Sequence, residues 1–242
     1  LNMNNGLFQV TDRIYQVRGF DVSNMTIIEG DTGVILIDPL STAETARAGL
    51  DLYFQERGER PVVAVLYTHS HVDHYAGVKG VITQEQVDAG ETAVLAPEGF
   101  MEAAVSENVY AGNAMTRRVT YQYGPLLPRG ELGQAYPLGA ITLIAPTDII
   151  SQTGETRVID GVEMEFQIVS GTEAPAEMTV YFPQFKALDS AEIACPLLHN
   201  ILTLRGAQVR DPKKWASALN ELIARYGDRT DVVFAQHNWP RW

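Results

Sequence analysis

The 242-residue chain has a single cysteine and no long hydrophobic run. With Cys195 alone, an intramolecular disulfide is impossible, and cysteine usage does not fix the redox compartment. The longest apolar runs, at residues 62–67 and 232–235, are far shorter than the roughly 20 residues that cross a bilayer. We therefore expect no membrane span, and we expect Cys195 to be a small buried hydrophobic residue.

Basic residues are also few, since 18 Lys and Arg stand against 30 Asp and Glu and give a formal net charge of −12. A protein that binds nucleic acid carries a basic surface, so this balance argues against a nucleic-acid partner. It does not exclude an anionic small molecule. Exposed charges are screened over about 8 Å at physiological salt, and the local charge of a cleft decides what enters it.

No internal repeat, Ser/Gly linker or low-complexity segment divides the chain, and 45% of its residues are hydrophobic. Residues 1–242 are therefore predicted to form one domain that buries a full core. The first residues, Leu-Asn-Met-Asn-Asn, show no basic region followed by an apolar one, so they do not indicate a signal peptide.

Helix and strand patterns alternate along the chain and predict an α/β fold. Residues 25–38 indicate a β-hairpin, and residues 42–57 indicate an amphipathic helix, with Ser41 and Glu44 at capping-box spacing. Residues 61–68 form an apolar run typical of a strand buried on both faces. Further strands are expected at 92–96, 140–145, 157–159, 162–169, 178–182, 186–189 and 231–236. Further helices are expected over most of 97–123 and from Pro212, with Asp211 as N-cap.

The most informative segment is Thr68-His69-Ser70-His71-Val72-Asp73-His74, because it holds three of the five histidines in the chain. In an extended segment, His69 and His71 project to the same side and can converge on one metal ion. The turn that follows lets Asp73 and His74 face a second ion, and two ions about 3.5 to 4 Å apart can activate a shared water. The alternative is a set of solvated loop histidines with no ligand role.

This segment resembles the signature of the metallo-β-lactamase-fold hydrolases. Other stretches resemble the catalytic domain of the bacterial alkylsulfatases that hydrolyse dodecyl sulfate; they lie at residues 17–21, 106–109, 111–115, 171–177, 202–206 and 237–240. The resemblance covers nearly the whole chain and implies a four-layer αββα sandwich of the metallo-β-lactamase type.

The resemblance also implies a binuclear metal site with four histidine and three carboxylate ligands. These are a first set of His69, His71 and Glu173, a second set of Asp73, His74 and His237, and a bridging Glu192. Two Zn²⁺ ions are expected, with Mn²⁺ or Fe as alternatives. Asp73 and Glu192 are expected to take part in catalysis. Without the resemblance, Glu173 and Glu192 would be ordinary surface glutamates, and His237 could be a structural histidine.

Four residues are expected to bind the substrate. Arg205 is expected to hold a sulfate group, because a planar guanidinium can grip two oxyanion oxygens, and its alternative role is a surface ion pair. Asn113 and Tyr123 are expected to line the substrate entrance, although an aromatic residue at such a position can also belong to a core. His199 is expected to donate a proton to a leaving group or, alternatively, to bond to the backbone.

The expected activity is hydrolysis of alkyl sulfate esters to an alcohol and inorganic sulfate by a metal-activated water. The alternatives are another hydrolase of this fold, acting on a lactam, thioester or lactone, and a non-catalytic metal-binding remnant. The resembling enzymes continue beyond the matched residues with a dimerisation region and a lipid-carrier-like domain, so the length of the alkyl chain stays open. They also suggest a homodimer and a bacterial periplasmic or secreted location.

Overall fold

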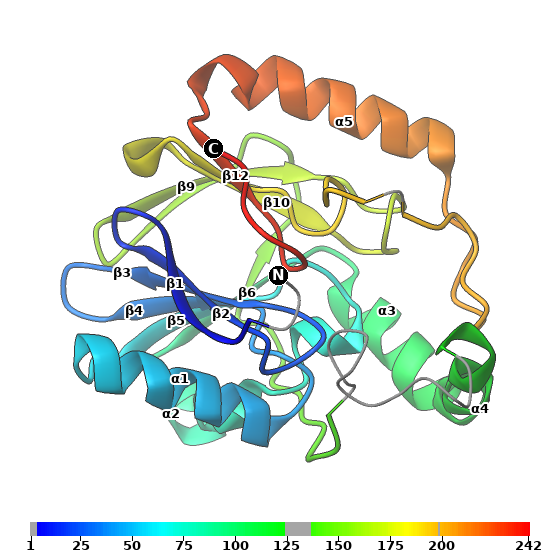
Figure 1. The fold of residues 1–242 in the computed structure, drawn as a ribbon, viewed down its shortest axis with the longest axis horizontal. Coiled ribbons are helices and arrows are strands. Elements are labelled where there is room, and N and C mark those ends of the chain that lie inside the picture. The colour runs from blue at the N-terminus through cyan, green and yellow to red at the C-terminus, as the bar shows by residue number, and fades with distance from the viewer. Residues whose placement is uncertain (1–3, 124–136, 198) are drawn as a thin grey trace.

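Two β-sheets lie face to face in the computed structural model, and helices cover the outer face of each sheet (Figure 1). The structure describes residues 4–123, 137–197 and 199–242. From one side to the other, the layers are helix, sheet, sheet and helix. The prediction of a four-layer αββα sandwich is therefore confirmed.

The first sheet has seven strands that lie side by side in the order of the sequence. They are β1 (Gly6–Thr11), β2 (Ile14–Arg18), β3 (Met25–Glu29), β4 (Val34–Ile37), β5 (Val62–Leu66), β6 (Ala93–Pro97) and β7 (Asp148–Ile150). The first four strands pair antiparallel, and β4 to β7 pair in parallel. Thr26 lies opposite Ile37, which confirms the predicted hairpin. β1, β2 and β7 were not predicted from the sequence.

The second sheet has five strands, and each overlaps a strand that the sequence predicts. In spatial order they are β12 (Val232–Phe234), β11 (Ala187–Asp189), β10 (Met178–Phe182), β9 (Val162–Ile168) and β8 (Thr156–Ile159). β11 and β12 pair in parallel, while the other neighbours pair antiparallel.

Buried hydrophobic side chains fill the spaces between all four layers. Leu66 of the first sheet and Phe166 of the second belong to one core cluster between the sheets. α1 (Ala43–Arg57) and α2 (Gln84–Asp88) cover the outer face of the first sheet, and α5 (Pro212–Tyr226) covers the second. This packing holds the ends of the strands, and the loops that follow them, in fixed positions.

α1 begins one residue later than the capping-box spacing suggests. Thr42 is the N-cap, and its side chain accepts a hydrogen bond from the backbone N–H of Thr45. Ser41 instead donates its hydroxyl to Oδ1 of the buried Asp21 at 2.6 Å. At the start of α5 the prediction is confirmed, because Asp211 accepts from the first N–H groups and Pro212 begins the helix.

Residues 140–145, predicted as a strand, are not in a strand. The N–H of Thr142 donates to the loop carbonyl of Ala76 at 2.8 Å, and the carbonyl of Ile144 accepts from the Tyr67 hydroxyl. Because these partners are a loop and a side chain, no strand ladder forms. The sheet gains β7 after Pro146 instead.

The predicted helical stretch at 97–123 contains α3 (Phe100–Val105), a π-helical turn at Ser106–Tyr110 and α4 (Gly112–Tyr123). These helices lie together at one end of the sandwich (Figure 1). Single π-helical turns occur often at functional sites. This one carries Glu107, which faces the histidine cluster described below.

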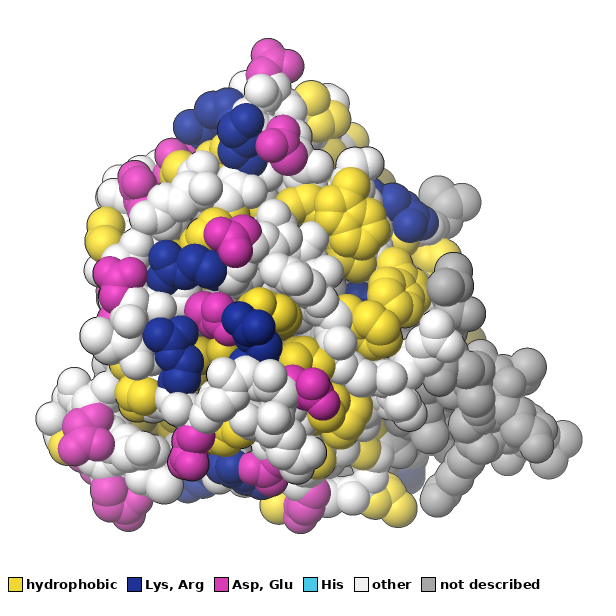
Figure 2. Space-filling view, turned by 60° about the vertical axis from the view of Figure 1, so that its left-hand side comes forward, with side chains coloured by type: hydrophobic (Ala, Val, Ile, Leu, Met, Phe, Trp, Pro, Cys, Tyr) yellow, Lys and Arg dark blue, Asp and Glu magenta, His cyan; other side chains and the backbone are white. Residues whose placement is uncertain are grey.

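Of the helices that the structure describes, none is long and apolar enough to cross a membrane. Figure 2 shows one face of the molecule, where acidic, basic and hydrophobic side chains are interspersed and no histidine is visible. On this face the net negative charge is therefore not gathered into one acidic patch.

Candidate metal centre

The histidine cluster lies in the loop that follows β5. An isolated β-bridge joins His69 to Glu177, which lies just before β10 of the second sheet. A short 3-10 helix at Val72–His74 then turns Asp73 and His74 toward the same region. The cluster is thus placed at the edge where the two sheets meet.

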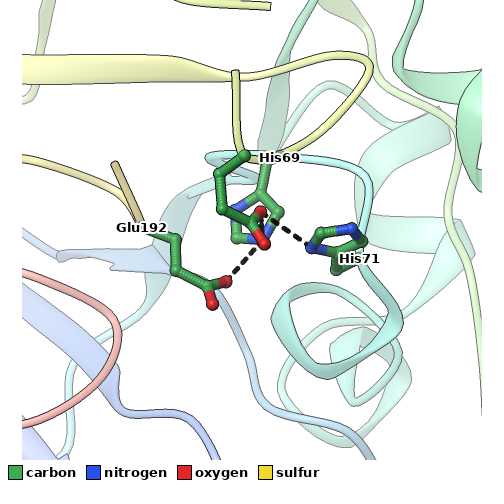
Figure 3. A group of neighbouring side chains, drawn as sticks. His69, His71 and Glu192 are labelled. Carbon is green, nitrogen blue, oxygen red and sulfur yellow. Dashed lines mark ion pairs between the residues drawn. The ribbon is translucent and has the colours of Figure 1, made fainter. Parts of the chain in front are cut away.

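One group of potential ligand atoms comes from His69, His71, Glu173 and Glu192. Figure 3 labels three of these residues, His69, His71 and Glu192. His71 Nδ1 lies 3.0 Å from Glu173 Oε2. His69 Nε2 lies 3.7 Å from the same oxygen and 3.2 Å from Glu192 Oε2. One ligand atom from each of the four residues lies within 4.8 Å of all the others, so the group could hold a metal ion.

Asp73, His74 and His237 form a second group with the same property. His74 Nε2 lies 3.2 Å from Asp73 Oδ2 and 3.2 Å from His237 Nε2. His237 follows β12, so this group joins the loop after β5 to the end of the second sheet.

Glu192 lies between the two groups. Its Oε2 is 3.2 Å from His69 Nε2 and 3.5 Å from the Nε2 atoms of both His74 and His237. The structure thus brings together all seven residues of the expected ligand sets. The assignment of individual ligands stays a prediction.

Two buried polar atoms in this cluster have no hydrogen-bond partner among the described residues. They are His69 Nε2 and Glu173 Oε2, and both belong to the first group. Leaving a buried polar atom unpaired costs about 1–3 kcal/mol. A divalent cation placed among these atoms would give each of them a partner, so the residues fit a metal site.

The second ring nitrogen of three histidines is engaged by the protein. His69 Nδ1 lies 2.9 Å from Thr68 Oγ1, His74 Nδ1 lies 2.8 Å from Asp38 Oδ2, and His237 Nδ1 lies 2.9 Å from the Val22 carbonyl oxygen. An acceptor at this outer nitrogen holds the ring proton there, which leaves the lone pair of the inner nitrogen for a metal. The arrangement is typical of metal-binding histidines.

The surrounding carboxylates attract positive charge to this cluster. Burial lowers the pKa of His71, but the charge of Glu173 outweighs it, and the pKa rises to about 9. For His74, burial also lowers the pKa, and the charges of Asp73 and Asp38 raise it well above its usual value. Without a metal, the cluster therefore favours protons on His71 and His74, whereas burial lowers the pKa of His69.

Glu177 is a further buried carboxylate, and it was not predicted from the sequence. Its Oε2 accepts from the N–H of Ala174 at 3.1 Å and the hydroxyl of Thr172 at 3.0 Å, and its Oε1 accepts from the N–H of Glu192 at 3.3 Å. Burial, followed by the charges of Glu173 and Glu192, raises the pKa of Glu177 to about 8. Glu177 thus ties the loop that carries Glu173 to the loop that carries Glu192.

Asp38 and Arg210 are two further buried residues that contact the cluster and were not predicted. Asp38 follows β4, and because β4 pairs in parallel with β5, it emerges at the same sheet edge as the histidines. Parallel pairing of these two strands, both of which the sequence predicts, would have pointed to Asp38. Arg210 stands immediately before the N-cap of α5 and contacts Glu173, and no local sequence pattern marks it.

The expected substrate residues lie around the first group, in different environments. Arg205 is partly exposed, and its Nη2 lies 3.4 Å from Glu107 Oε1; the other oxygen of Glu107 is 3.9 Å from His71 Nε2. Asn113 is exposed on α4. Tyr123 ends α4, and its side chain lies outside the described part of the structure.

His199 lies next to Glu192 rather than on a backbone group. Its Nε2 is 2.6 Å from Glu192 Oε1, and its Nδ1 is 2.8 Å from Arg210 Nη1. Among the described residues, both ring nitrogens of His199 thus meet side chains, and its role as a proton donor stays a prediction. Cys195, expected to be buried, is only partly buried, with its Sγ near the Glu192 carbonyl oxygen. Burial raises the pKa of this thiol.

The αββα sandwich and the cluster of histidines and carboxylates at its edge together define a metal-dependent class of proteins. The chain belongs to the metallo-beta-lactamase superfamily, whose family model matches residues 18–237. A metallo-beta-lactamase from Pontibacter korlensis shares the fold, with a TM-score of 0.64 at 18% identity.

Within this class the chain is similar to sulfatases. It is 54% identical to an (R)-specific secondary-alkylsulfatase of Pseudomonas sp. over 100% of the chain, and 50% identical to the alkyl/aryl-sulfatase BDS1 of Saccharomyces cerevisiae over 99%. The structure of the stereoselective inverting sec-alkylsulfatase Pisa1 from Pseudomonas sp. matches 98% of the chain, with a TM-score of 0.94 and 53% identity. The chain spans 38% of the length of both curated relatives and 39% of the Pisa1 chain.

Proposed function

We propose that this chain binds two Zn²⁺ ions and hydrolyses alkyl sulfate esters to an alcohol and inorganic sulfate. The observation that carries this proposal is the convergence of four histidines and three carboxylates on one point, in a chain 54% identical to an alkylsulfatase. When bound, the ions lower the pKa of a water molecule and offset the negative charge of the ester.

Glu192 and Asp73 orient the reacting groups. Glu192 Oε2 faces the inner nitrogens of both histidine groups, while its Oε1 pairs with His199 Nε2 at 2.6 Å. This carboxylate–imidazole pair can hold a proton beside the substrate and exchange it between Nε2 and Oε1. Asp73 Oδ2 lies 3.2 Å from His74 Nε2 and 3.5 Å from His237 Nε2.

Arg205 binds the sulfate group. Its guanidinium lies at the rim of the first group, paired with Glu107, and can present two parallel N–H donors to an oxyanion. Asn113 and Tyr123 of α4 keep their proposed role at the substrate entrance; Asn113 is exposed, and the side chain of Tyr123 lies outside the described residues.

The proposal is tested by measuring metal content together with turnover. Purified protein supplemented with zinc should hold close to two equivalents per chain and hydrolyse dodecyl sulfate or a secondary alkyl sulfate faster than a lactam or a neutral ester. His69→Ala and His74→Ala should each abolish this turnover. Asp160→Asn removes a carboxylate that caps the Thr32 and Gly33 N–H groups, outside the cluster, and should leave turnover unchanged.

Three outcomes would count against the proposal. One equivalent of metal or none would contradict the binuclear site. Two equivalents with faster lactam or ester hydrolysis would indicate another hydrolase of this fold. Two equivalents with no turnover of any substrate would indicate a non-catalytic metal-binding protein.

A further inference from the structure

Arg210 is a buried cation in direct contact with two residues of the site. Only 5% of it is exposed. Its Nε donates to the Glu173 carbonyl oxygen at 2.7 Å, and its Nη2 pairs with Glu173 Oε1. Its Nη1 lies 2.8 Å from His199 Nδ1 and 2.8 Å from both the carbonyl oxygen and Oδ1 of Asn200.

We propose that Arg210 is a positioning residue that sets the ring tautomer of His199 and makes Glu173 a ligand through one oxygen only. The inference rests on the proposed function, because it concerns two residues of that site. It fixes which atom donates and which accepts in the hydrogen bonds that run from Arg210 through His199 to Glu192.

The tautomer follows from the donors that a guanidinium possesses. Arginine has five N–H donors and no acceptor. Since Arg210 Nη1 is within hydrogen-bond distance of His199 Nδ1, that nitrogen must accept with its lone pair. The proton of the neutral ring is then on Nε2, which donates to Glu192 Oε1 at 2.6 Å. Arg210 thereby points the only N–H of this imidazole into the site.

The same guanidinium divides the two oxygens of Glu173. Oε1 is taken by Arg210, whereas Oε2 faces His71 Nδ1 at 3.0 Å and His69 Nε2 at 3.7 Å. Oε2 is also one of the buried atoms that have no hydrogen-bond partner in the part of the chain that the structure describes. A carboxylate held in this way offers a single oxygen to an ion, because rotating the second oxygen toward the ion would break the pair with Arg210.

The geometry needs the planar fork of arginine rather than a positive charge alone. The three nitrogens of Arg210 reach acceptors on three residues, Glu173, His199 and Asn200. A lysine ammonium has three donors at one point and cannot reach all of these acceptors together. Arg210→Lys therefore distinguishes the effect of the positive charge of Arg210 from the effect of its fork geometry.

The test reads the tautomer of His199 directly. With only five histidines in the chain, long-range ¹H–¹⁵N correlations on zinc-supplemented, ¹⁵N-histidine-labelled protein can resolve each ring, and His199→Gln identifies the His199 signals. The wild type should show a protonated Nε2 and an unprotonated Nδ1 at His199. A protonated Nδ1 in the wild type would overturn the proposal without any variant.

Two variants and one control complete the experiment. Arg210→Met should give a mixture of His199 tautomers and weaken zinc retention about 10- to 100-fold. Arg210→Lys should recover part of either effect. Arg229→Met removes an arginine that stacks on Tyr181 and pairs with Glu165, outside the cluster, and should lower stability while leaving the His199 tautomer unchanged. An unchanged tautomer in Arg210→Met, or the same change in Arg229→Met, would contradict the proposal. The spectra remain decisive even if no sulfate ester is hydrolysed.

Discussion

The carboxylate of Asp38 accepts a hydrogen bond from His74 and, through Thr68, also orients His69. Asp38 Oδ2 lies 2.8 Å from His74 Nδ1 and accepts the Thr68 hydroxyl at 2.6 Å. Because the hydroxyl donates to Asp38, its oxygen is left to accept from His69 Nδ1 at 2.9 Å. One buried carboxylate therefore fixes the two imidazoles that face the two metal positions.

Asp38→Asn should weaken metal binding at both positions. His74 and the Thr68 hydroxyl both donate to Oδ2, and the Thr68 N–H donates to Oδ1. An amide nitrogen at the Oδ2 position removes the acceptor that both rings depend on, and one at the Oδ1 position faces the Thr68 N–H and displaces the loop that carries His69. Partners of this kind are worth about 10- to 100-fold in metal affinity. Competition between the protein and a coloured zinc chelator measures the change.

Asp160→Asn is the matched control for Asp38→Asn, since it neutralises a carboxylate with several donors near the start of β4, at the opposite end of that strand from Asp38. Equal zinc affinity in Asp38→Asn and wild type would mean that Asp38 only supports the fold.

Arg205→Ala should reduce kcat/KM for alkyl sulfates by roughly 10- to 150-fold. Losing a hydrogen bond to a charged group costs about 1.5–3 kcal/mol, and about 1.4 kcal/mol corresponds to a factor of ten. Arg205→Lys should recover only part, because it keeps the charge and loses the fork. Hydrolysis of a neutral aryl ester and the zinc content serve as controls. Equal losses for sulfate and neutral esters would show that Arg205 supports the fold or the metals.

The metal-free protein should become less stable as pH rises from about 6.5 to 9. The pKa of His71 is raised from 6.5 to about 9, so its stabilising contribution is complete below 6.5 and disappears as pH rises through 9. That contribution is worth up to roughly 3 kcal/mol. The raised pKa values of His74 and His237 act in the same direction. So does that of Glu177, whose contribution is present below about 4.5 and is lost as pH rises through about 8.

Calorimetric Tm values in EDTA between pH 6 and 9 measure this effect. His71→Gln should fall less steeply than the wild type over that range. Saturating zinc should reverse the trend, because metal ligands bind in their deprotonated forms. A Tm of the metal-free wild type that stays constant or rises over this range would contradict the prediction.

Arg18→Lys should loosen the segment that carries His237. Arg18 stacks 4.1 Å from the ring centroid of Trp239 and donates to the carbonyl oxygen of Asn238. Lysine loses the planar stack and the fork, at a cost of about 1–2 kcal/mol. Zinc titration should then show the second equivalent binding more weakly than the first. Arg229→Lys, which alters a stack on Tyr181, should lower Tm without this effect on zinc.

Much of the fold could be predicted because its signals are local. The apolar run at 61–68 contains β5, a strand between two layers, and the cap at Asp211 begins a helix as expected. The prediction of a strand at 140–145 was wrong. Its residues are mostly hydrophobic, as in a strand, but its backbone bonds to a loop carbonyl and a side-chain hydroxyl. Ile141 remains 63% exposed. Hydrophobic periodicity indicates which residues prefer burial, but it does not indicate which other segment pairs with their backbone.

The same limit applies to the candidate site. Three histidines and an aspartate within six residues can be recognised from spacing alone. Glu173 and Glu192 could be proposed only by resemblance, because each lies in a loop with no ligand pattern of its own. Arg210 acts on Glu173, which is 37 positions away in the sequence, through a contact that exists only after α5 has docked on the second sheet.

The expected metal ligands are divided between the two halves of the sandwich. His69, His71, Asp73 and His74 follow β5 of the first sheet, whereas Glu173, Glu192 and His237 lie in loops between or after strands of the second. Bound ions would therefore act as a cross-link between the sheets, in addition to their chemical role. Their removal should speed amide hydrogen exchange in β5 and β11 together, because each sheet would lose its anchor to the other at that edge.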